Sequence, residues 1–168
     1  MSMIPLTSLP PDSRLWIFPS STPLTPEIRS ALGRSLETAL EAWNAHGSPV
    51  QWGYEFAHDR FLLIAVNEAV TALSGCSIDH AVRALQVLEH KHGLVLTDSH
   101  RVFYRRGEDI TAAARPDFSL LAERGEVTLD TVVFDCTASS LSAYLSGAWE
   151  SPARRTWHAQ AFPFEVAR

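Results

Sequence analysis

A chain of 168 residues is long enough for one domain with a hydrophobic core, and its hydrophobic fraction of 46% excludes a disordered protein. The net charge of −5 disfavours nucleic acid as a partner, because proteins that bind phosphates usually carry a basic excess. The longest apolar run, Phe61 to Val66, is too short to cross a bilayer. Since the N-terminus lacks the features of a signal peptide and the two cysteines lie far apart, we expect a cytoplasmic protein without membrane insertion.

The first two thirds of the sequence predict the order strand-helix-strand-strand-helix-strand. Apolar patterns indicate strands over residues 14–18, 51–57, 60–66 and 101–105. Thr25 can cap a helix that begins with Pro26, and apolar residues at helical spacing continue to Trp43, with Gly47 as the stop. Ser77 can cap a second helix, which Gly93 ends.

This order is typical of a ferredoxin-like β-α-β-β-α-β sandwich, a fold of the α+β class. In that topology the first and third strands are central, and the second and fourth lie at the edges. The continuously apolar third segment fits a central strand. The second segment contains Gly53 and Glu55, and the fourth contains Arg101 and Arg105, as exposed edges tend to.

The remaining third is expected to be a C-terminal extension that packs on this core, because it contains two tryptophans, Trp149 and Trp157. Its expected elements are a strand over residues 109–113 that pairs with the fourth strand across Gly107, a helix over 116–124, a strand over 131–135 and a helix over 137–146. We therefore expect a single domain over residues 1–168, made of an N-terminal arm (1–13), the core (14–105) and the extension (106–168).

The segment from Ser74 to His80 is the most unusual local feature. Cys76 lies where the second helix begins, and the positive end of the helix dipole favours a thiolate. His80, in the same turn, could serve as its base, while Asp79 and Ser77 are candidate ligand-binding residues. The structural alternative is also coherent and is the favoured one: Cys76 is a small hydrophobic side chain, Ser77 only caps, Asp79 complements the dipole and His80 faces water.

His46 is a second candidate base, and Trp43 beside it is a further candidate ligand-binding residue. Because the second and third strands form a hairpin, the end of the first helix and the start of the second are expected at the same end of the molecule. His46 could then meet Cys76. Alternatively, a histidine in the last turn of a helix caps carbonyl groups.

The sequence predicts neither a metal site nor a cofactor. His90 and His92 are two positions apart on a helix and do not share a face, so we interpret this segment as a solvated helix end. There is no phosphate-binding loop and no dinucleotide fingerprint. The aromatic residues Trp52, Tyr54 and Phe56 are expected to pack under the helices rather than form a stacking platform for RNA.

Nearly the whole chain resembles a family of small, uncharacterised bacterial proteins of about this length. The resemblance is carried by Arg14-Leu-Trp-Ile, Trp43-x-x-His46-Gly47, Arg60-Phe-Leu, Gly75-Cys-Ser-Ile-Asp79, Pro116-Asp-Phe118, Trp149-Glu-x-Pro152 and Trp157-His158. Members often carry the label "ABC transporter ATPase", which this sequence does not support because it lacks a Walker A loop. The resemblance implies that the extension belongs to the domain and assigns no catalytic residue.

Three functions follow as hypotheses. The first is a non-enzymatic accessory domain that binds an unknown small molecule or protein partner near His46, Cys76, Asp79 and His80. The second is a thiol-dependent enzyme with Cys76 as nucleophile and a histidine base. The third, nucleotide hydrolysis, rests on the family label alone and is disfavoured. Because the segment 51–57 is an expected edge strand, a homodimer is possible.

Overall fold

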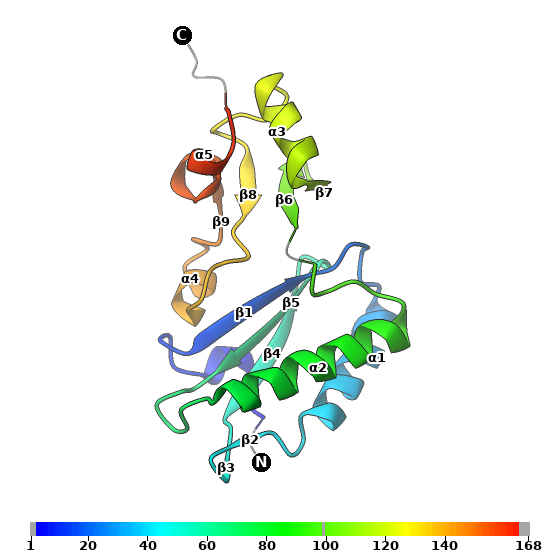
Figure 1. The fold of residues 1–168 in the computed structure, drawn as a ribbon, viewed down its shortest axis with the longest axis vertical. Helices are drawn as coiled ribbons and strands as arrows, with labels where there is room; N and C mark the ends of the chain where they lie inside the picture. Colours follow the sequence, from blue (N-terminus) through cyan, green and yellow to red (C-terminus); the bar gives the residue numbers. More distant parts are fainter. Residues whose placement is uncertain (1–2, 99, 165–168) are drawn as a thin grey trace. The chain divides into compact units, whose positions relative to one another are not determined.

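Strands from the two halves of the chain pair into separate antiparallel sheets, which confirms the α+β class (Figure 1). The computed structural model describes residues 3–98 and 100–164, so the ends of the expected arm and extension (1–2 and 165–168) lie outside the described residues. The chain divides into two compact units, one comprising Met1–Thr97 with Ser139–Ser142, the other Asp98–Ala138 with Ala143–Arg168. That residues 1–168 form one domain stays a prediction.

The first unit contains a three-stranded antiparallel sheet. Its strands are β1 (Arg14–Pro19), β4 (Trp52–Ala57) and β5 (Phe61–Val66), in the order β1-β5-β4. All six residues of β5 are buried, which confirms the apolar third segment as the central strand. The second segment, β4, lies at an edge as predicted.

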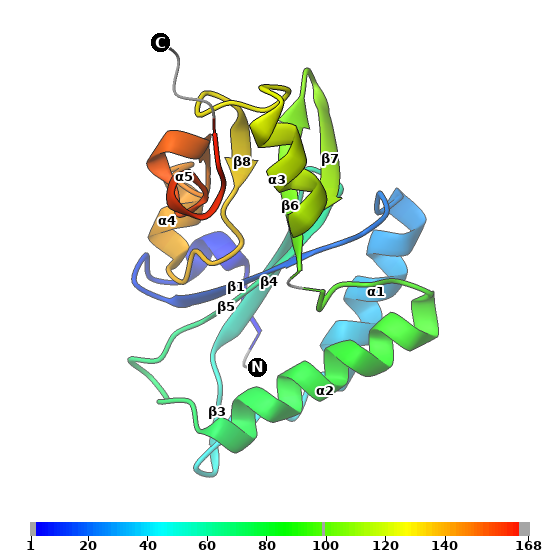
Figure 2. The same ribbon diagram turned by 45° about the horizontal axis from the view of Figure 1, so that its top comes forward.

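Two helices, α1 (Pro26–Ala39) and α2 (Gly75–His92), lie side by side and pack on one face of this sheet (Figure 2). Thr25 caps α1 by accepting a hydrogen bond from the backbone of Ile28, and Gly93 follows α2 in the left-handed conformation, both as predicted. The shared core contains Leu32 and Leu36 of α1, Leu85 and Leu88 of α2, and Trp52, Leu62, Ile64 and Val66 of the sheet. The aromatic residues of β4 therefore pack under the helices and form no open platform.

The ferredoxin-like topology is not confirmed, because the strand order differs. The first strand was expected at the centre of this sheet and the fourth at an edge, but β1 is the first strand in the order β1-β5-β4 and the fourth strand is absent from it. Instead, Ser139–Ser142 lies beside β1: the Leu15 amide donates to the Ser139 carbonyl at 2.9 Å, and the Leu141 amide donates to the Ser13 carbonyl at 2.9 Å. The predicted fourth strand, β6 (Arg101–Arg106), belongs to the other sheet. There it pairs with the next strand of the chain on one side and with a later strand on the other.

The second unit contains a four-stranded antiparallel sheet in the order β7-β6-β8-β9. Its further strands are β7 (Asp109–Ala114), β8 (Val132–Phe134) and β9 (Glu150–Pro152). The predicted pairing of β6 with β7 across Gly107 is confirmed over six residue pairs. The helix α3 (Arg115–Glu123) places Phe118, fully buried, among Tyr104 and Phe162.

The remaining elements are short. They are η1 (Leu6–Ser8), β2 (Asn44–Ala45), β3 (Ser48–Pro49), α4 (Leu141–Leu145), η2 (Ala153–Arg155) and α5 (His158–Ala161). The helix expected over residues 137–146 is therefore only five residues long. Among the helices that the structure describes, none is both long and apolar enough to cross a bilayer.

Candidate functional site

The cap of α2 lies three residues before the predicted cap. Ser74, not Ser77, is the cap: its backbone is extended and its hydroxyl accepts a hydrogen bond from the Ser77 amide at 3.2 Å. Gly75 and Cys76 are consequently the first two helical residues. The predicted capping role of Ser77 is wrong, and its hydroxyl is left for other contacts.

Ser77 joins the first turn of α2 to the chain that follows α1. It is 4% exposed, and its Oγ accepts a hydrogen bond from Trp43 Nε1 at 2.8 Å. The same hydroxyl lies 3.2 Å from the Asn44 carbonyl, to which it donates. Trp43, 2% exposed, also directs Nε1 at the Ser77 carbonyl, at 3.0 Å. Both residues were candidate ligand-binding residues, and the structure shows their polar atoms bonded to each other.

His46 lies in a hairpin turn, not in the last turn of a helix as predicted. The helix α1 ends at Ala39, and the chain then forms the small antiparallel pair β2 and β3. His46 and Gly47 are the two residues between them, with φ of 52° and 79°. Positive φ at both positions is the geometry of the two-residue hairpin turn that matches strand twist. The capping role considered for His46 therefore does not apply.

His46 and the start of α2, which were predicted to lie at the same end of the molecule, border the same open space. His46, Cys76 and His80 line one open hollow of about 330 Å³, which we call the polar hollow. Its other lining residues are Ala42, Trp43, Asn44, Ser74 and Ser77. Cys76 and His80 are four positions apart on α2 and so share a face. Asp79 is exposed and does not line the hollow.

The three residues that face the polar hollow have unused hydrogen-bonding capacity. His46, Cys76 and His80 are all exposed, and within the described residues none of them hydrogen-bonds to another side chain. In particular, no hydrogen bond joins the Cys76 sulfur to either imidazole there. The hollow therefore offers two imidazoles and one thiol to a bound molecule, but no assembled nucleophile-base pair.

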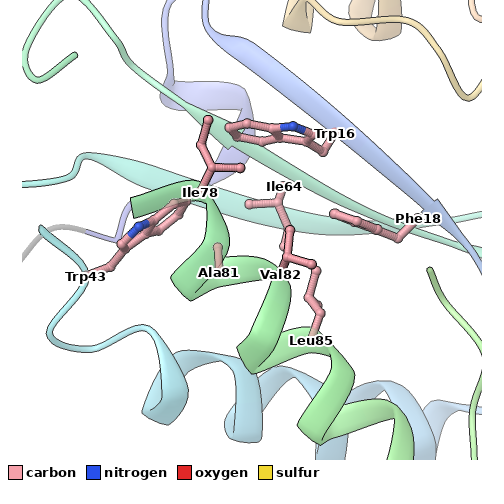
Figure 3. A pocket seen from close by; sticks show the side chains of 8 residues that line it. All are labelled: Trp16, Phe18, Trp43, Ile64, Ile78, Ala81, Val82 and Leu85. Atoms are coloured by element: carbon pink, nitrogen blue, oxygen red, sulfur yellow. The ribbon is translucent and has the colours of Figure 1, made fainter. Parts of the chain in front are cut away.

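An apolar pocket adjoins the polar hollow, and Trp43 lines both. Figure 3 shows Trp16 and Phe18 of β1 on one side of this pocket and Ile78 and Val82 of α2 on the other. Its interior of about 20 Å³ is room for about one water-sized or methyl-sized group. In this conformation, space for a larger ligand lies in the polar hollow.

The acidic and histidine-rich end of α2 is not arranged as a metal site. The Glu89 carboxylate accepts hydrogen bonds from the amides of Leu96 and Thr97, the latter at 2.6 Å. Over residues 3–98 and 100–164, no group of three or more His, Cys, Asp or Glu side chains could hold a metal ion.

A buried histidine in the second unit was not among the candidate site residues. His158 is 1% exposed, its Nδ1 lies 2.8 Å from Thr156 Oγ1, and its ring stacks on Trp157 at 3.9 Å between centroids. Burial lowers its pKa to about 4; Arg115 acts in the same direction and Asp135 opposes it. Its surroundings make it a structural residue, and no sequence signal distinguishes it from the exposed histidines.

Comparisons of the chain with protein-family models, with curated proteins and with solved structures found no match.

Proposed function

We propose that this chain is a non-enzymatic binding domain that takes up a small polar ligand in the polar hollow. The observation that carries the proposal is the exposure of His46, Cys76 and His80 around one hollow, without hydrogen bonds to other side chains in the described residues. Behind them, the buried Trp43–Ser77 hydrogen bond holds the two lining segments together. Exposed polar side chains around a hollow, whose lining segments are joined by a buried hydrogen bond, favour ligand binding over core packing.

The chemistry of the hollow favours a ligand with a carboxylate or a similar electron-rich group. The hollow lies at the N-terminal end of α2, where the helix dipole is positive, and no carboxylate is among its lining residues. Each imidazole can donate one hydrogen bond when neutral and two when protonated. A ligand with a methyl-sized group could also use the adjoining apolar pocket.

A fragment screen by saturation-transfer NMR, with matched carboxylates, amides and amines, tests this proposal. We expect carboxylates to bind preferentially and the double variant His46→Ala/His80→Ala to lose their binding by about tenfold or more, because two donors are removed. Asp79→Ala is the matched control, since Asp79 is exposed on the same helix but outside the lining, and it should bind within about twofold of wild type. Equal binding by the double variant and wild type would remove the polar hollow as the site.

A thiol-dependent enzyme is the second candidate, favoured by one observation: exposed Cys76 lines the same hollow as two histidines. Alkylation by iodoacetamide at pH 5 to 9, followed by mass spectrometry, separates the two candidates. The binding proposal expects Cys76 to react at about the rate of free cysteine. Cys136 is the internal control: the residue is partly exposed, but desolvation of its thiol, with Asp135 nearby, raises the pKa to about 12, so it should react far more slowly than free cysteine. Reaction of Cys76 many times faster than free cysteine at pH 7 would favour the enzyme.

The other expectations from the sequence stay predictions. They are the cytoplasmic location, the resemblance to the uncharacterised bacterial family and the possible homodimer. Nucleotide hydrolysis is not proposed, because the sequence lacks a phosphate-binding loop.

A further inference from the structure

A second, larger groove runs between the outer faces of α1 and α2, and it is lined by cationic groups. Its volume is about 510 Å³, within the range of small-molecule sites. Its lining residues are Ala31, Arg34, Ser35, Thr38 and Ala39 of α1 and Val87, Leu88, Lys91 and His92 of α2. None of them is acidic. We call this the interhelical groove.

The polar groups of the interhelical groove converge on one hydroxyl. Lys91 Nζ donates to Ser35 Oγ at 3.2 Å, and His92 Nε2 lies 3.3 Å from the same oxygen. Arg34, one position before Ser35 on α1, lines the groove as well, with Nη1 donating to the Ser30 hydroxyl at 2.5 Å. Small side chains at Ala31 and Ala39, four residues before and after Ser35, leave the space open.

The positive charge of the interhelical groove is not neutralised from within. In the described parts of the chain, neither Arg34 nor Lys91 pairs with a carboxylate, although the net charge of the chain is −5. Elsewhere arginines do pair, as Arg29 with Asp59 at 2.8 Å and Arg105 with Glu150 at 2.6 Å.

The helix dipole explains only part of this arrangement. Lys91 and His92 occupy the last turn of α2, where the dipole favours cations. Arg34 lies in the interior of a different helix, so the dipole of α2 does not account for it.

We propose that the interhelical groove binds the phosphate group of a small soluble molecule. A guanidinium can donate two parallel hydrogen bonds to a phosphate, and an ammonium adds a point charge. The hydroxyl of Ser35 adds a neutral donor, whereas the Thr38 hydroxyl already donates to the Arg34 carbonyl at 2.9 Å. This site is distinct from the polar hollow, which lies at the opposite end of α2.

Titration of the full chain with pyrophosphate at constant ionic strength, followed by NMR of backbone amides and arginine side chains, tests the proposal. We expect saturable shifts centred on Arg34, Ser35 and Lys91, and a loss of affinity of about tenfold or more in Arg34→Gln/Lys91→Gln. Arg83→Gln is the matched control, because Arg83 is exposed on α2 outside the groove. Its affinity should match wild type.

Two further experiments test whether the anion binds in the polar hollow instead and whether the phosphate belongs to a lipid. His46→Ala/His80→Ala should bind pyrophosphate as wild type does; a loss of binding in this variant would place the anion in the polar hollow and overturn the proposal.

Sedimentation with vesicles of phosphatidylglycerol or phosphatidylcholine tests a lipid source of the phosphate. Retention on the anionic vesicles without binding of free pyrophosphate would overturn the soluble ligand. Equal shifts with chloride, or equal affinity of wild type and Arg34→Gln/Lys91→Gln, would show bulk screening only and also overturn it.

Discussion

Replacement of Trp43 by alanine is expected to lower the free energy of unfolding by about 3–5 kcal/mol, the cost typical of removing a buried tryptophan. Trp43 is 2% exposed and packs edge-on against Trp52, with ring centroids 5.9 Å apart. Its loss would leave a cavity between α2 and the sheet, because the indole lines both the polar hollow and the apolar pocket. Urea unfolding followed by circular dichroism measures the change.

Trp43→Phe keeps one aromatic ring but removes Nε1 and the second ring of the indole. We expect a cost of about 1–3 kcal/mol, smaller than that of alanine, because the donor to Ser77 is lost and a smaller cavity forms. Ser77 would still donate to the Asn44 carbonyl. Equal stability of wild type and Trp43→Ala would contradict the role of Trp43 as the base of the hollow. Ligand binding lost in Trp43→Phe at nearly unchanged stability would show that the Nε1 bond positions the lining segments.

Acidification is expected to destabilise the second unit through His158. In the folded protein its pKa is about 4, whereas its ordinary value is 6.5. As the pH falls below 6.5, the unfolded chain takes up a proton that the folded protein excludes. The contribution of His158 to the free energy of unfolding is therefore fully present above pH 6.5 and decreases as the pH falls from 6.5 to 4. Below pH 4 this residue causes no further change. The full loss is about 3 kcal/mol at the usual value per pKa unit.

His158→Phe isolates this contribution from the carboxylates that titrate in the same range. Phenylalanine keeps a ring against Phe118 and Trp157 but cannot titrate. Thr156 Oγ1 loses its contact with the imidazole and keeps its hydrogen bond to the Ala153 carbonyl. Unfolding followed by resolved amide signals of the second unit at pH 7 and pH 4.5 compares the two proteins. The difference between the two pH values should be smaller in the variant by roughly 2 kcal/mol or more. The same pH dependence in both proteins would mean that His158 does not couple protonation to folding.

Local signals in the sequence predicted the start of α1 and the end of α2, but they placed the cap of α2 at Ser77 instead of Ser74, because two serines that can both cap lie three residues apart. The Thr25 cap and the Gly93 stop depend on hydrogen bonds and backbone angles within a few residues. The hairpin across Gly107 is local in the same sense. The end of α1 was missed because Leu40 and Trp43 are buried at helical spacing although the chain beyond Ala39 is no longer helical.

The candidate site was predicted in outline from topology. His46 and Cys76 were expected to meet because the hairpin of β4 and β5 brings their segments to one end, and they line one hollow. The sequence did not indicate that Asp79 lies outside the lining or that Ser77 bonds to Trp43. Both depend on the position of the chain after α1, which is fixed by packing between residues more than 30 positions apart.

The sequence by itself determined the α+β class, the buried central strand β5 and the limits of most long elements, because apolar periodicity and capping act between close neighbours. Only the tertiary structure decided that β6 leaves the first sheet and that Ser139–Ser142 lies beside β1. It also decided that cationic groups from two helices share one groove. Strand pairing and helix contacts join residues that are distant in the chain. Because the backbone groups of all strands are chemically alike, the local sequence does not predict which strand pairs with which.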